Sequence, residues 1–236
     1  MDNIILFEKI PVILEEQILL DRMQVRKSKA FSKDFHWAVE QVRDSIHPRG
    51  LVGIATISYI DENVVKIGNQ DFTSRILQVN LNSSEQVFPF LVTIGPKLET
   101  IASQQKSLLK KYFLETIGDF ILQNATWYLE RQIQERFSVK QISSMSPGSL
   151  EDWGMAQQVP LFNLFGSEAT EKLGVQLSSN MVMNPRKSIS GIAFHSKRAF
   201  VSCQLCSRNR CPGRRAPYTP EKFGEYGLSL PRETIK

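Results

Sequence analysis

Cysteine is scarce in this chain of 236 residues, and long apolar runs are absent. Three cysteines are too few, and odd in number, for a secreted disulfide scaffold, so we expect reduced thiols in the cytoplasm. No stretch approaches the roughly 18 consecutive apolar residues that a membrane span needs. The segment from Met1 to Ile13 carries Asp2, Glu8 and Lys9 and lacks a basic leader with a cleavage site, so it does not resemble a signal peptide. We therefore expect neither a membrane protein nor a secreted one.

The charge of the chain is distributed unevenly. Hydrophobic residues are 42% and charged residues 22%, which is typical of a globular protein with one large or two small domains. The net charge is +5, but residues 197–236 alone hold nine Lys or Arg and three Glu, which leaves +6 there and −1 elsewhere. The sequence thus predicts a nearly neutral body with a basic tail.

Apolar periodicity predicts alternating strands and helices. Strands are expected at 3–13, 51–59, 64–67, 86–94, 177–182, 188–194 and 198–202, with hairpins joining 51–59 to 64–67 and 188–194 to 198–202. Helices are expected at 14–23, 34–46, 97–137 in two pieces, 155–165 and 168–173, with a further one starting at 71–75. Because neighbouring strands connect mainly through turns, the fold class is α+β with a largely antiparallel sheet.

Single residues in this pattern carry structural expectations. The second piece of the 97–137 helix has a broad apolar stripe that includes Trp127, and Gly118 inside it is expected to pack closely against a neighbouring strand. Asp152 is interpreted as a helix cap and Trp153 as a core residue. After residue 202, frequent Pro and Gly interrupt the chain. We therefore predict an α+β domain over 1–202 and a Cys/Arg/Pro-rich tail over 203–236.

All three cysteines, Cys203, Cys206 and Cys211, lie within nine residues of the tail. Two thiols separated by two residues can bind one metal site from a tight turn, and a third can close over it. An iron–sulfur cluster and zinc are both open, with His195 as a candidate fourth ligand or one iron left open. Neighbouring arginines would balance the negative charge of thiolates. The alternative is that these are ordinary thiols of a cytosolic protein.

A loop, Ser146-Pro147-Gly148-Ser149, follows the long helix, and its glycine would let a ligand approach the backbone. Further motifs accompany it in a fixed order: Thr93 to Pro96 before it, and Gln157-Gln158, Leu161 to Phe165, Gly174 to Ser178, Met183 to Pro185 and Lys187 to Gly191 after it. This order, over about 92–218, resembles the activation (reactivation) domain of cobalamin-dependent methionine synthase. It is most similar to short stand-alone proteins that carry this domain without the rest of the enzyme.

The resemblance implies a single curved domain around a twisted antiparallel sheet. It implies that S-adenosylmethionine binds in a shallow groove and that the domain meets a cobalamin-carrying partner. There, an electron and the methyl group of S-adenosylmethionine would restore methylcobalamin from cobalt(II), in methionine biosynthesis. By the same resemblance, groove residues are expected at Ser144, Met145, Ser146, Pro147, Gly148, Ser149 and Phe200.

The resemblance also assigns roles to these residues. Pro147 and Gly148 would supply backbone contacts, Ser149 takes the place of an aromatic that faces the corrin, and Phe200 falls near aromatics that contact the nucleoside. Ser144 stands where the full-length enzymes have the arginine that binds the carboxylate of S-adenosylmethionine. The cysteine tail is absent from those enzymes, so electrons from a donor protein are expected to arrive through a cluster held by this chain rather than from a flavodoxin.

An alternative from a different class is a metal-stapled basic module that binds a polyanion or docks a protein without catalysis. Few aromatics are interleaved with the basic side chains of the tail, so nucleic acid is not an expected partner. We therefore expect reductive reactivation of a corrinoid methyltransferase, with the three cysteines as the metal-ligating residues.

Overall fold

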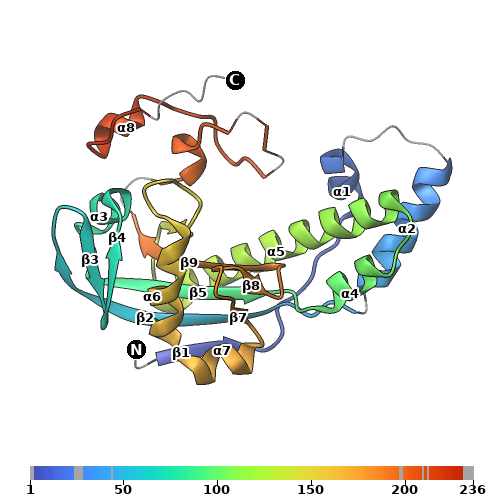
Figure 1. Cartoon of the computed structure of the whole chain (residues 1–236), viewed down its shortest axis with the longest axis horizontal. Coiled ribbons are helices and arrows are strands. Elements are labelled where there is room, and N and C mark those ends of the chain that lie inside the picture. Colours follow the sequence, from blue (N-terminus) through green and yellow to red (C-terminus); the bar gives the residue numbers. More distant parts are fainter. Residues whose placement is uncertain are drawn as a thin grey trace.

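The structure is a computed structural model that describes residues 3–23, 29–43, 45–196, 199–208, 210–211 and 213–230 (Figure 1). The strands of its main sheet are β1 (Asn3–Phe7), β2 (Arg49–Ile60), β3 (Val64–Ile67), β4 (Gln70–Thr73), β5 (Gln86–Thr93), β6 (Ile142–Met145) and β9 (Ser188–His195). They pair in the order β4-β3-β2-β5-β9-β6, and β1 pairs with β2. Every one of these pairings is antiparallel, which confirms the predicted fold class.

Helices surround this sheet on both faces and extend beyond it (Figure 1). They are α1 (Glu16–Met23), α2 (Lys29–Arg43), α3 (Arg75–Leu81), α4 (Lys97–Ser103), α5 (Leu108–Phe137), α6 (Gln158–Phe165), α7 (Ser167–Leu173) and α8 (Lys222–Glu225), with 3-10 turns η1 (Met155–Gln157) and η2 (Ser202–Leu205). A small hairpin of β7 (Gln176–Leu177) and β8 (Met183–Asn184) lies beside them. No helix in these described ranges is both long and apolar enough to cross a bilayer.

Alternation along the strands divides the core into two layers. On β5, Phe88 and Phe90 face the C-terminal half of α5, while Val87 and Leu91 face the opposite layer. That opposite layer contains α3, α6 and Trp153. It also contains four side chains of the C-terminal segment, by which we mean the described residues from 199 to 230: Phe200, Leu205, Phe223 and Tyr226. A third cluster joins α1, α2 and α4 to the N-terminal half of α5, at the end of the molecule away from the C-terminal segment (Figure 1).

The observed elements confirm most of the predicted ones. The 51–59 and 64–67 hairpin is present as β2 and β3, and the long helical stretch breaks into α4 and α5. Residues 71–75 are a correction: Gln70–Thr73 form β4, and the helix begins only at Arg75. Of the extended stretch expected at 177–182, only Leu177 lies in a strand, at the end of β7.

The predicted partner for 188–194 is also corrected. β9 pairs with β5 and β6, which lie far from it in sequence, and 199–202 form no strand. Lys197 and Arg198 lie outside the described residues. Because β9 is buried between two strands, its pairing is decided by the core and not by the turn that follows it.

Gly118 permits a close approach between two helices rather than between a helix and a strand. A Cβ at this position would lie 2.3 Å from Cδ2 of Leu98 on α4 and 3.4 Å from Cε of Lys187. The close packing is therefore as predicted, but the neighbour is α4.

Asp152 caps a helix, as predicted, but the helix is α3 and lies far upstream. Its carboxylate accepts hydrogen bonds from the backbone N–H of Arg75 (3.2 Å) and of Ile76 (3.0 Å) and from the Ser74 hydroxyl. Ser74 is itself the N-cap, since its Oγ accepts from the N–H of Leu77. The loop that carries Asp152 is thus fastened to the first turn of α3. Trp153 is fully buried, which confirms its core assignment.

Candidate functional site

A cleft of about 820 Å³ lies at the β6 edge of the sheet. This volume is within the range of small-molecule sites, roughly 300–1,000 Å³. Three walls enclose it: α5, the β6 strand end with the loop that follows, and the C-terminal segment. The residues that line it include Tyr112, Glu115, Asp119, Gln123 and Trp127 on α5, Ser144, Ser146, Gly148 and Ser149 on β6 and its loop, and Cys203, Cys206, Arg208, Cys211 and Arg215 on the C-terminal segment.

The structure thus brings together two groups of residues that are more than fifty positions apart in sequence. The loop at Gly148 and all three cysteines border the same cleft. Each thiol is partly exposed, and none is in a disulfide. The chain can therefore present its loop and its thiols to one bound molecule.

The loop is a compact turn whose shape depends on glycine. Gly148 has φ of 80°, in the left-handed region, and a Cβ there would lie 2.0 Å from Sδ of Met155. The N–H of Gly148 donates to the carbonyl of Trp153 (2.7 Å), and that of Ser149 donates to the carbonyl of Ser146 (3.1 Å).

These bonds correct the expected role of the loop backbone. Proline has no N–H, and the Gly148 and Ser149 N–H groups are engaged inside the turn, so Pro147 and Gly148 do not offer free donors to a ligand. Met145 is 1% exposed and Pro147 is buried, and neither is among the residues that line the cleft. Ser146 and Ser149 are the loop positions that place hydroxyls on the cleft wall.

Ser144 faces an acid. Its hydroxyl donates to Oε1 of Glu130 on α5 at 2.6 Å. A carboxylate ligand at this point would meet negative charge where the full-length enzymes present arginine. The positively charged side chains of the cleft lie instead on the C-terminal segment, at Arg208 and Arg215.

Phe200 lies in the core and not on the cleft. It is 7% exposed, and its ring packs edge-on against Tyr226 with ring centroids 5.9 Å apart. Its N–H donates to the buried hydroxyl of Ser143 (2.9 Å). The expected contact of Phe200 with a bound nucleoside therefore has no geometric basis in this arrangement.

The side chain of Arg214 connects several parts of the chain between Cys203 and Ala216. Its guanidinium donates to the carbonyls of Cys203 (3.0 Å), Cys206 (3.1 Å) and Ala216 (3.2 Å), and also to that of Arg208. Its guanidinium is thus half-buried and engaged by backbone carbonyls, which makes it a poor contact for a polyanion. The sequence shows a basic residue at this position, but it does not reveal that the side chain binds four backbone carbonyls.

The three thiols border one cleft but do not form a closed site. Within the described ranges, no three His, Cys, Asp or Glu side chains are arranged to hold a single ion. His195, the candidate fourth ligand, is exposed at the end of β9, and its Nδ1 lies 3.1 Å from the carbonyl of Gln141. It is not among the residues that border the cleft.

Two aromatic side chains on α5 belong to the cleft although the apolar pattern predicts otherwise for Trp127. Tyr112 and Trp127 are each 42% exposed, and both border the cleft. Trp127 therefore lies outside the core that its neighbours in the stripe form. The available signal was the three- and four-residue spacing of polar side chains along this face of α5, at Thr116, Asp119 and Gln123.

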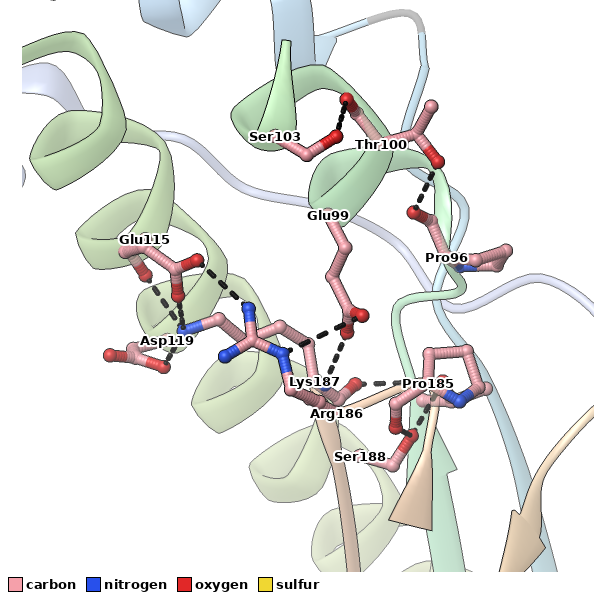
Figure 2. A network of polar contacts seen from close by, with 11 residues as sticks. Pro96, Glu99, Thr100, Ser103, Glu115, Asp119, Pro185, Arg186, Lys187 and Ser188 are labelled. Carbon is pink, nitrogen blue, oxygen red and sulfur yellow. Dashed lines mark hydrogen bonds and ion pairs between the residues drawn. The ribbon is translucent and has the colours of Figure 1, made fainter. Parts of the chain in front are cut away.

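An ion-pair network braces the α5 wall (Figure 2). Lys187, whose side chain is 11% exposed, contacts Oε2 of Glu115 (2.8 Å) and Oδ1 of Asp119 (2.5 Å). Arg186 pairs with Glu115 and with Glu99 on α4. Partial burial alone would raise the pKa of Glu115, but the hydrogen bonds and charges of Lys187 and Arg186 together hold that pKa below its ordinary value. Glu115 is therefore held on the cleft wall as a carboxylate, and Asp119 is paired with Lys187 beside it.

Comparison with known proteins identifies the fold. No protein-family model and no curated protein sequence matches the chain. Among solved structures, the chain is similar to the MetH reactivation domain bound to AdoHcy, with a TM-score of 0.57 and 12% sequence identity. The match covers 90% of this chain and 81% of that chain. The chain therefore has the fold of a MetH reactivation domain, which confirms the resemblance seen in the motifs.

Proposed function

We propose that this protein reactivates a corrinoid methyltransferase in the cytoplasm by restoring methylcobalamin from its cobalt(II) form. The observation that carries the proposal is the cleft itself, where the β6 loop and the three thiols meet on a MetH reactivation domain fold. The solved domain of that fold was crystallised with AdoHcy, which supports S-adenosylmethionine as methyl donor for this chain.

The reaction balances with one electron and one methyl group. One electron reduces cobalt(II) to cobalt(I) on the partner protein. The electron pair of cobalt(I) then takes the methyl group from the sulfonium of S-adenosylmethionine, which leaves as S-adenosylhomocysteine. Because methylation consumes cobalt(I), the low-potential reduction is drawn forward.

The chain's own task is to position the donor and exclude water. The dimensions of the cleft suit a ligand of nucleoside size, and hydroxyls of Ser146 and Ser149 provide hydrogen-bonding groups on one wall. Asp119 on the opposite wall places negative charge near a cationic sulfonium. Arg208 and Arg215 are the groups that suit the carboxylate of the donor, since Ser144 is bonded to Glu130.

Calorimetry with S-adenosylhomocysteine tests the ligand part of this proposal. Wild-type protein is expected to bind, and Ser146→Trp is expected to weaken binding by about tenfold or more, because the indole fills the cleft from the wall that carries Ser146. Ser167→Trp, on the exposed first turn of α7, is the matched control and is expected to bind as the wild type does. Absence of binding by the wild type, or equal binding by all three proteins, would contradict the assignment of this cleft.

A further inference from the structure

We infer that Cys203, Cys206 and Cys211 bind an iron–sulfur cluster on the wall of the cleft, with one iron free of protein thiolate. The inference deepens the proposed function, on which the use of the cluster rests. Its binding, however, can be measured without corrinoid or S-adenosylmethionine. Thiolates are the preferred ligands of such clusters.

The first observation is that Arg214 contacts the backbone of all three cysteines. Its guanidinium binds the carbonyls of Cys203 and Cys206, and its own N–H donates to the carbonyl of Cys211 (3.1 Å). Cys206 N–H also donates to the carbonyl of Cys203 (3.3 Å), which forms the turn at η2. A segment with little regular structure is therefore held so that three thiols face one cleft.

The second observation is the polarity around the sulfur atoms. The N–H of Arg215 donates to Sγ of Cys203 at 3.4 Å, the kind of N–H···S bond that stabilises cluster thiolates. Arg208 and Arg215 border the same cleft, and residues 199–220 contain no Asp or Glu. Bringing three thiolates together is costly without nearby positive charge, and this wall supplies that charge.

Among the described side chains no compact set of ligands surrounds a single point, which favours a cluster over one ion. Four ligands at the Zn–S distance of about 2.3 Å require sulfur atoms about 3.8 Å apart. The described side chains do not meet the requirements of such a compact site. In a cluster each thiolate binds a different iron, so the ligand sulfurs stand farther apart than they do around one ion.

The cluster would act as the electron relay for the partner. A low-potential electron-transfer protein would reduce the cluster by one electron. The cluster would then be oxidised by one electron as cobalt(II) becomes cobalt(I). Since the thiols border the cleft in which the methyl donor is proposed to bind, both reactants would approach cobalt from one face.

The test is anaerobic reconstitution of the full chain with ferrous iron and sulfide, followed by iron, sulfide and zinc analysis. We expect about four iron and four sulfide per chain and a visible absorption that dithionite bleaches. Cys203→Ser, Cys206→Ser and Cys211→Ser are each expected to lose most of the iron. A metal-free wild type, or one that binds zinc alone, would overturn the inference.

Arg214→Lys distinguishes the hydrogen bonds of Arg214 from its positive charge, because lysine keeps the charge but cannot donate to several carbonyls at once. It is expected to lower iron content several-fold, while Arg210→Lys, the same change at an exposed neighbour, is expected to keep it. Circular dichroism would verify that both variants fold. Equal iron in the two variants would overturn the role of Arg214, whatever the outcome of any reactivation assay.

Discussion

Replacing Asp152 by alanine is expected to lower the free energy of unfolding by about 3 kcal/mol. The carboxylate accepts two backbone N–H groups at the first turn of α3 and the hydroxyl of Ser74, and all these donors are partly or fully buried. Alanine leaves them without an acceptor. The same change also releases the loop of Gly148 from α3. We therefore expect the cleft to change shape in addition to the loss of stability.

Denaturant unfolding of paired variants measures this effect. Asp152→Asn retains one acceptor oxygen and is expected to lose about 1 kcal/mol. Asp71→Ala, an exposed acid on nearby β4, is the control and is expected to stay within about 0.5 kcal/mol of the wild type. If Asp152→Ala unfolds at the same denaturant concentration as Asp71→Ala, the capping account is wrong.

Lys187→Met is expected to cost about 2 kcal/mol at neutral pH and to flatten the acid limb of the stability profile. Methionine can occupy the space of the buried methylene groups of Lys187, but it leaves Glu115 and Asp119 without the ammonium group that both acids contact. In the wild type, the pKa of Glu115 in the folded state lies below its ordinary value of 4.5. A lowered folded pKa contributes stability above pH 4.5, and this contribution is lost as the pH falls through the folded pKa.

Unfolding measured from neutral to strongly acidic pH distinguishes this from general loss of packing. The wild type should lose stability more steeply on acidification than Lys187→Met, because Lys187 is the main source of the lowered pKa. Lys97→Met, on the exposed first turn of α4, should follow the wild-type curve. Parallel curves for the wild type and Lys187→Met would contradict the account of this network.

Local patterns were sufficient to predict much of the fold. Short apolar runs indicate β2 and β5, because each strand is buried between two apolar layers. The 3.6-residue period predicts α5, because the helix buries apolar side chains along its whole length. Its N-terminal half packs against other helices, and its C-terminal half packs against the sheet. The partners of β9 escape prediction because strand pairing is a long-range choice that neighbouring residues do not encode.

The site, like the fold, has parts that local sequence predicts and parts that depend on long-range contacts. Clustering in sequence already marks Cys203, Cys206 and Cys211 as one chemical unit, and the motif order marks the Gly148 loop. The rest of the site depends on contacts that no spacing reveals, such as Arg214 reaching four carbonyls behind the thiols and Trp127 leaving the core for the cleft wall. A basic residue and an aromatic residue look the same in sequence whether they face solvent, a ligand or the backbone.

The most direct measurement of the proposed function is anaerobic conversion of a cobalt(II) corrinoid protein to its methylcobalamin form. S-adenosylmethionine and a low-potential reductant are supplied with or without this chain, and the corrinoid spectrum and S-adenosylhomocysteine are recorded together. We predict that the methylcobalamin spectrum appears with this chain present, matched by one S-adenosylhomocysteine per cobalt. The same spectrum at the same rate without the chain, or no methylation with it, would contradict the proposal.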